Sequence, residues 1–156
     1  MEKNYETLYF AKLGCYKLKE NAKLPTKGSD HAACYDLYSC SDEPILIDPK
    51  ERMLIPIGLV LDIPRGFSAR IHTRSGMAAK KGIGLSVSQG IIDSDYVEEV
   101  FVPMVNNTNK SFFINPGDRI AQLELVREIV TDVYETQERP EQKTDRDGGF
   151  GSTGVK

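Results

Sequence analysis

The sequence lacks any apolar run long enough to cross a membrane. It also lacks a basic start followed by an apolar core, so we expect no secretory signal peptide. Basic charge is not in excess, because 20 Lys and Arg residues stand against 23 Asp and Glu residues. No broad basic surface for duplex nucleic acid is therefore expected. These absences predict a protein that neither enters a membrane nor binds nucleic acid stably, and that is cytoplasmic, or nuclear in a eukaryote, rather than secreted.

Cysteine is scarce as well, with three residues in the chain. An odd number without a secretory marker favours a reducing compartment, and we expect Cys15, Cys34 and Cys40 to be small buried side chains. A metal cluster of His31, Cys34 and Cys40 is not expected, because the spacing is not that of a zinc site and a fourth ligand is missing.

Short stretches rich in Ile, Val, Tyr and Phe, separated by turn signals such as Asn115-Pro116-Gly117-Asp118, make up most of the chain. They predict a single all-β domain, a sandwich or jelly roll, without repeats. One or two helical turns are expected near Met77–Lys81. The predicted strands are Thr7–Leu13, Tyr35–Ser39, Ile45–Ile47, Met53–Asp62, Ser68–Thr73, Ile83–Ser88, Val100–Asn106, Phe112–Ile114 and Arg119–Val130.

The composition changes near the C-terminus. No large apolar side chain occurs from Glu135 to Gly149, so nothing ties this run to a core. We therefore expect residues 1–134 to form the domain and residues 135–156 to form a flexible arm.

The last eleven residues contain four glycines and two hydroxyl side chains around Phe150. Glycine amides and the Ser152 and Thr153 hydroxyls suit an anion, and Phe150 offers a flat face to a ring. This composition predicts a mobile lid over a nucleotide. A plain disordered terminus is the alternative.

Several polar residues occur where packing alone would not put them. Arg74-Ser75-Gly76 combine a guanidinium, a hydroxyl and a small residue, which suits a phosphate, although a surface Arg before a turn is the alternative. Gln122 within an apolar strand is either edge-exposed or a neutral phosphate donor. Asp36 within another apolar strand is either a paired core carboxylate or a magnesium anchor.

The segment Gly90–Tyr96 carries two aspartates and a tyrosine after an apolar run. One aspartate suffices for an Asx-turn. The other is a candidate general base, with Tyr96 placed to cover a sugar. The preceding segment, 83–92, is interrupted by glycine and predicts a hairpin.

Five blocks in this order resemble the trimeric all-β dUTP pyrophosphatases (dUTPases), over nearly the whole chain. Any one block alone can arise by chance, whereas five in this order are highly specific. The blocks are Ala32–Leu37, Pro64–Ala78, Gly90–Tyr96, Gly117–Leu123 and Gly148–Gly154.

The resemblance implies a homotrimer of jelly-roll subunits, with the β-clip-like dUTPase fold and active sites at subunit interfaces. It implies Mg²⁺-dependent hydrolysis of dUTP to dUMP and pyrophosphate, which limits uracil incorporation into DNA and supplies dUMP for dTMP synthesis. Asp93 would activate the water that attacks the α-phosphorus, and Tyr96 would pack under the deoxyribose and exclude a 2′-hydroxyl. Asp36 would hold the magnesium ion through its water shell.

The resemblance also implies that three subunits build each site. The hairpin Leu85–Ile92 would read the uracil edge with main-chain groups, and a second subunit would hold the phosphate chain. The arm of a third would close with Phe150 on the uracil and Ser152 and Thr153 on the β and γ phosphates. The implied substrate-binding residues are Arg74, Ser75, Gly76, Ser88, Gln89, Gly90, Ile92, Tyr96, Gln122, Arg146, Phe150, Gly151, Ser152 and Thr153.

Two departures from the family pattern concern the site. Arg146 lies four residues before Phe150, whereas the family's Arg commonly lies five residues before its Phe. After Tyr96 the chain continues Val97-Glu98-Glu99, where the family generally has Arg-Gly.

Three alternatives stand beside the dUTPase hypothesis. A dCTP deaminase shares the fold, but its additional Arg and Glu would fall near Ala79 and Pro103, which cannot do that chemistry. A nucleotide-binding regulatory protein of this fold is the alternative from another class, and the presence of Asp93, Tyr96 and Arg74 argues for catalysis instead. A purely structural jelly roll leaves the five polar blocks unexplained.

Overall fold

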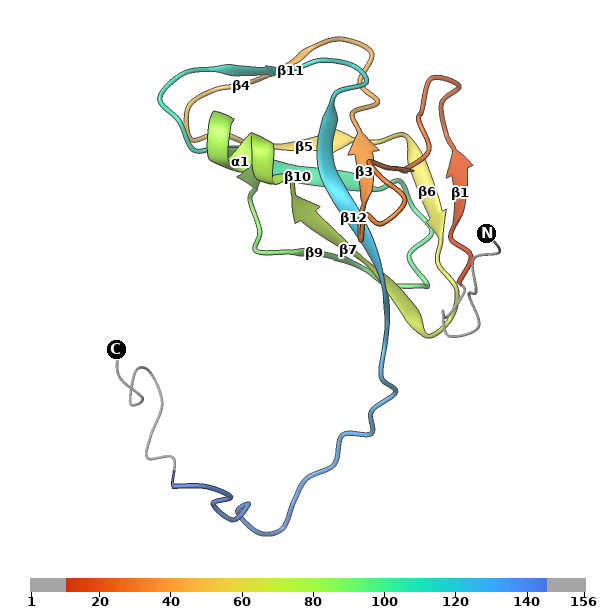
Figure 1. Ribbon diagram of the computed structural model, residues 1–156, viewed down its shortest axis with the longest axis vertical. Helices are drawn as coiled ribbons and strands as arrows, with labels where there is room; N and C mark the ends of the chain where they lie inside the picture. The colour runs from red at the N-terminus through yellow and green to blue at the C-terminus, as the bar shows by residue number, and fades with distance from the viewer. Residues whose placement is uncertain (1–10, 146–156) are drawn as a thin grey trace.

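The computed structural model describes residues 11–145, which form short strands and one short helix (Figure 1). Within these residues, no helix has the length and apolar character needed to cross a membrane. The elements are β1 (Gly14–Lys17), β2 (Thr26–Lys27), β3 (Tyr35–Tyr38), β4 (Ile45–Ile47), β5 (Arg52–Pro56), β6 (Leu59–Asp62), β7 (Phe67–Thr73), α1 (Ser75–Lys81), β8 (Ile83–Leu85), β9 (Gly90–Ile92), β10 (Phe101–Asn106), β11 (Phe112–Ile114) and β12 (Arg119–Arg127).

The strands pair antiparallel in four sheets within the described residues. The largest has the order β2-β3-β12-β7-β9, and a second has the order β5-β10-β8. The pairs β1-β6 and β11-β4 complete the set. Figure 1 shows β12 lying between β3 and β7, and residues 128–145 leaving the body of the strands. The all-β prediction is confirmed, and the division into a domain and an arm at residue 134 stays a prediction.

One apolar core collects buried side chains from most strands. The large sheet shows how the sequence builds it, because successive strand residues point to opposite faces. On β7, Ala69 and Ile71 are buried, while the intervening Arg70 and the following His72 are only half-buried. The same alternation on β12 puts Leu123 in the core. The opposite, polar face of this sheet is therefore available for function.

The expectation that the cysteines are buried is confirmed for Cys40 and holds in part for Cys15 and Cys34. Cys40 is buried, Cys15 and Cys34 are half-buried, and all three are free thiols. Burial raises the pKa of each thiol, which keeps it protonated and weakly nucleophilic.

The predicted strand Met53–Asp62 folds as two strands, because the chain bends at Gly58. This residue has a φ of 68°, a left-handed conformation that side chains with a Cβ rarely adopt. A Cβ at this position would also lie 2.5 Å from Cys40 Sγ. Because of this bend, β5 and β6 belong to different sheets.

We expect Gly58→Ala to lower the free energy of unfolding by about 2–4 kcal/mol, because alanine would be strained in the left-handed conformation and its Cβ would overpack the core. Urea unfolding of both proteins measures the difference. Gly28→Ala is the matched control, because no heavy atom lies within 4 Å of a Cβ placed at Gly28. Equal midpoints for Gly58→Ala and wild type would contradict the prediction.

The prediction of a hairpin over residues 83–92 is wrong. β8 pairs with β10 in the three-stranded sheet, whereas β9 pairs with β7 at the edge of the large sheet. A Cβ on Gly90 would lie 3.0 Å from the Ile71 Cβ, so a residue without a side chain lets β9 approach β7. The linker of residues 86–89 thus passes from one sheet to the other.

Other differences concern the ends of elements. The described part of the predicted strand Thr7–Leu13 is not a strand, and the first strand within residues 11–145 is β1, which pairs with β6. The two-residue strand β2 was not predicted. The predicted helix is confirmed as α1, two residues longer at its start, and β12 ends at Arg127 rather than Val130.

Candidate active site

A cavity of about 260 Å³ lies where β7, β9 and β10 meet. Its walls are mostly apolar, and Asp93 contributes the one carboxylate to them. Four of the predicted site residues line this cavity together, namely Gly90, Ile92, Asp93 and Tyr96. Its full lining is Ile71, Gly90, Ile91, Ile92, Asp93, Tyr96, Val100, Phe101 and Pro103.

The turn after β9 holds Asp93 and Tyr96 in place. The Tyr96 N–H donates to the Asp93 carbonyl oxygen at 3.2 Å, so the turn closes through main-chain groups. The Tyr96 hydroxyl donates to the Glu99 carbonyl oxygen at 2.9 Å. The Glu99 carboxylate in turn accepts the Gly58 N–H at 3.1 Å. Glu99, directly after the two residues that stand in place of the family's Arg-Gly, therefore ties the turn to the bend between β5 and β6.

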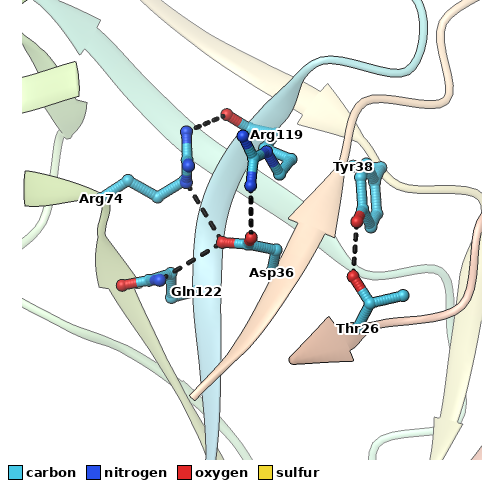
Figure 2. A network of polar contacts seen from close by, with 6 residues as sticks. All are labelled: Thr26, Asp36, Tyr38, Arg74, Arg119 and Gln122. Carbon is cyan, nitrogen blue, oxygen red and sulfur yellow. Dashed lines mark hydrogen bonds and ion pairs between the residues drawn. The ribbon is translucent and has the colours of Figure 1, made fainter. Parts of the chain in front are cut away.

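A second cluster surrounds Asp36 on β3 (Figure 2). The residue is only 5% exposed, yet its carboxylate accepts three side-chain hydrogen bonds. Arg74 Nε and Gln122 Nε2 donate to Oδ1, and Arg119 Nη1 donates to Oδ2, each at 3.2 Å. We call Asp36, Arg74, Arg119 and Gln122 the Asp36 network. Two guanidinium groups on one carboxylate leave a net positive charge, which suits an anion.

Strand register explains how this network assembles. Asp36 on β3 lies directly opposite Gln122 on β12, and Gln122 lies opposite His72 on β7. Directly opposed side chains on one face have Cβ atoms about 4.5–5.5 Å apart. Arg74 follows β7 by one residue and so lies beside the same face. Asp36 is thus paired as well as buried, which is compatible with both of its alternatives, and Gln122 lies on a central strand rather than an edge.

Ser75 and Gly76 begin α1 immediately after Arg74, and both are exposed. The space around Gly76 is open, because no heavy atom lies within 4 Å of a Cβ built there. A further cavity of about 230 Å³ is lined by Arg74 and Arg119 and also by Lys81. The neighbourhood of the Asp36 network is thus basic and accessible.

Ser88 and Gln89 lie in the exposed linker between β8 and β9, and neither lines the Asp93 cavity. The Gln89 side-chain amide lies 3.5 Å from His72 Nδ1, and His72 Nε2 lies 3.0 Å from Glu124 Oε2. The linker therefore lies near the polar face of the large sheet.

The structure brings the predicted residues together in two groups rather than one. Arg74 and Gln122 do not line the Asp93 cavity, and Asp93 does not line the cavity beside Arg74. The predicted residues Arg146, Phe150, Gly151, Ser152 and Thr153 lie outside the described residues.

Sequence reasoning did not include Arg119 among the site residues, although it lies inside the block Gly117–Leu123. A local signal for it exists. The adjacent apolar residues Ile120 and Ala121 interrupt the alternation of β12, which marks an irregular position in the strand.

The residues present fit a magnesium ion that is carried by a substrate. Within residues 11–145, no group of three or more His, Cys, Asp or Glu residues is arranged to hold a metal ion. Mg²⁺ keeps several waters and is usually held by one or two carboxylates together with substrate phosphates. A carboxylate offers about four acceptor positions. Asp36 uses three of them, so one stays available for a water of the metal's shell.

Comparisons with known proteins show which family this chain is similar to. The dUTPase family model matches residues 20–154. The deoxyuridine 5′-triphosphate nucleotidohydrolase of Hydrogenobaculum sp. is 41% identical over 145 residues, which cover 93% of this chain and 99% of that protein. The enzyme of the same name from Yarrowia lipolytica is 44% identical over 139 residues, which cover 88% of this chain and 86% of that protein.

Solved structures share the fold. The structure of a Staphylococcus bacteriophage 80alpha dUTPase mutant with dUpNHpp has a TM-score of 0.83 and 23% identity, and the match covers 94% of this chain and 100% of that chain. The predicted all-β jelly roll is thereby confirmed. The family model matches most of this chain, and relatives are more than 40% identical to it, so the chain belongs to the dUTPase family.

Proposed function

We propose that this chain hydrolyses dUTP to dUMP and pyrophosphate by attack of a water molecule on the α-phosphorus. It is an enzyme of the dUTP diphosphatase class, because relatives 38% to 44% identical over most of the chain carry the name deoxyuridine 5′-triphosphate nucleotidohydrolase. One observation carries the mechanism: the Asp93 carboxylate and the Tyr96 side chain line the same, otherwise apolar cavity.

In this proposal Asp93 is the general base. A carboxylate within hydrogen-bond reach of a water can take its proton as the oxygen attacks phosphorus. The cavity walls are mostly apolar, so they offer that water few other hydrogen-bond partners. Asp95 also lies in the turn but does not line the cavity, which distinguishes the two aspartates.

The nucleoside would be recognised by shape and by main-chain groups. β9 is an edge strand, paired with β7 on one side, so its other edge is available within the described chain. A backbone N–H and C=O pair matches the O4 and N3–H of uracil and mismatches the reversed pattern of cytosine. Tyr96 beside Asp93 would leave no room for a ribose 2′-hydroxyl.

The phosphate chain would bind at the Asp36 network and at Ser75 and Gly76. Charged guanidinium donors form stronger hydrogen bonds to phosphate oxygens than neutral donors do. Gln122 would add a neutral donor, and the Ser75 hydroxyl and Gly76 N–H are exposed beside Arg74. Bound Mg²⁺, met by Asp36 through water, would neutralise phosphate charge. A phage phi11 dUTPase structure with this fold concerns the coordination of a structural Mg(II) ion.

The separation of the two groups supports a site shared between subunits. The nucleoside cavity of one copy would face the Asp36 network of a second copy in a homotrimer. The arm of a third copy would supply Phe150 and the hydroxyls of Ser152 and Thr153. In the cell, the reaction would limit uracil incorporation into DNA and supply dUMP for dTMP synthesis.

The test is pyrophosphate release, with Mg²⁺, from dUTP, dCTP, dTTP and UTP separately. We expect release from dUTP alone, because the amino group, the methyl group and the 2′-hydroxyl are each rejected. Ammonia released from dCTP would favour the deaminase alternative, which Pro103 in the cavity wall argues against. Binding of dUTP without any release would favour a regulatory binding protein.

A further inference from the structure

We infer that Arg119 is a positioning residue that aims the Arg74 guanidinium at the phosphate chain of the substrate. This inference rests on the proposed function and adds a residue to it. The evidence for it is two contacts of Arg119: its side chain donates to Asp36, and its main-chain carbonyl accepts from Arg74.

The contacts hold the Arg74 guanidinium at two of its three nitrogens. Nε donates to Asp36 Oδ1 at 3.2 Å, and Nη1 donates to the Arg119 carbonyl oxygen at 3.1 Å (Figure 2). Within residues 11–145, Nη2 makes no hydrogen bond. Because the guanidinium is planar, fixing Nε and Nη1 also fixes the direction in which Nη2 points. Both N–H groups of Nη2 are therefore left for a ligand.

The Arg119 side chain completes the arrangement from the other side. Its Nη1 donates to Asp36 Oδ2 at 3.2 Å, so it anchors the carboxylate that anchors Arg74. A single guanidinium on Asp36 would form a neutral pair with little attraction left for an anion. With the second guanidinium present, the network keeps a net positive charge while Arg74 stays held.

An irregularity in β12 makes both contacts possible. Between Arg119 and Ala121 the register steps by two residues on β12 but by one on β3, from Tyr38 to Leu37. The extra residue is Ile120, which is 1% exposed and adjacent to the fully buried Ala121. Such a bulge re-aims side chains and interrupts the ladder.

The bulge explains why Arg119 and Gln122 share a target. In a regular strand, residues three apart point to opposite faces. The inserted Ile120 turns both side chains toward Asp36. The β12–β7 ladder begins at Ala121, so the Arg119 carbonyl lies outside it and can accept the Arg74 Nη1 hydrogen.

The Arg119 side chain is 53% exposed, whereas the Arg74 side chain is 24% exposed. Without the Arg119 side chain, the buried Asp36 carboxylate still accepts hydrogen bonds from Arg74 and Gln122, so it does not become an unpaired buried charge. Replacing Arg119 should therefore change ligand binding much more than it changes the melting temperature. That difference separates a positioning role from a structural one.

The experiment is a double-mutant cycle read by calorimetric titration with dUpNHpp in EDTA, which removes any contribution from metal. We expect Arg119→Gln to weaken binding about tenfold, the lower end for a hydrogen bond to a charged group. Arg74→Gln should weaken it at least as much. The double variant should bind no more weakly than Arg74→Gln alone, because Arg119 acts through Arg74.

Two further variants sharpen the result. Arg119→Lys should keep most of the affinity, because an ammonium group still pairs with Asp36. Arg52→Gln on β5, a strand of another sheet, is the matched control and should bind as wild type does.

The inference would be overturned if the fold-losses in affinity of Arg119→Gln and Arg74→Gln multiplied in the double variant. Arg119 would then contact the ligand independently of Arg74. Unchanged binding by Arg119→Gln would overturn it as well. In either case, binding and turnover by wild type would leave the proposed function standing. Failure of wild type to bind dUpNHpp and to turn over dUTP would overturn both.

Discussion

The Asp93→Asn variant is expected to hydrolyse dUTP about 10²- to 10⁴-fold more slowly than wild type, the range for loss of a general base. Asparagine has nearly the shape of aspartate, so the cavity walls and the turn to Tyr96 should persist. The amide cannot take a proton from the attacking water. The expected signature is thus a fall in kcat with binding retained.

Two measurements on the same preparation check this result. Pyrophosphate release gives kcat, and titration with dUpNHpp gives the affinity. Asp95→Asn is the matched control, because it makes the same chemical change two residues away, outside the cavity lining. Near-normal turnover by Asp93→Asn, or an equal loss in both variants, would refute the role given to Asp93.

Removal of residues 148–156 is expected to lower kcat/KM for dUTP by at least about a hundredfold. The segment carries Phe150, two hydroxyl side chains and glycine amides, and contacts to charged phosphates contribute about 1.5–3 kcal/mol each. Closure of such a lid also excludes bulk water from the reacting centre. This prediction rests on composition and on the family resemblance, because the segment lies outside the described residues.

The truncated protein should still fold and assemble, because within residues 11–145 the buried core cluster already runs from Ala22 to Leu123. The molar mass from light scattering after size exclusion should correspond to the same oligomeric state for both proteins. Removal of Val155 and Lys156 alone, which follow the fifth block, is the control and should leave turnover near wild type. A monomeric or unfolded product would show that the tail is structural, and normal turnover would contradict the lid.

Local pattern accounts for most of the strands. Ile45–Ile47 and Phe112–Ile114 were predicted at their observed bounds, because apolar runs between turn residues require no knowledge of the partner strand. Alternation likewise assigns Ala69 and Ile71 to the core and Arg70 to the other face. The order of the five blocks, read from sequence, led to the family that the comparisons confirm.

Where the prediction failed, the cause was the identity of a partner strand. Residues 83–92 have the local pattern of a hairpin, yet β8 and β9 join different sheets. Met53–Asp62 likewise divides at Gly58 into β5 and β6, which pair with β10 and β1 in different sheets. Neither fact is contained in a short window of sequence, because it depends on a residue or strand elsewhere in the chain.

The sequence by itself determined the all-β class and the polar blocks, and it supplied Asp93, Tyr96 and Arg74 as candidate functional residues. Only the tertiary structure decided that Asp36 accepts hydrogen bonds from three side chains and that Arg119, 83 positions further along, is one of the donors. The reason is physical. Side-chain alternation is a property of each strand alone, whereas the partners of a side chain depend on strand register and on a bulge, which form when distant segments pair.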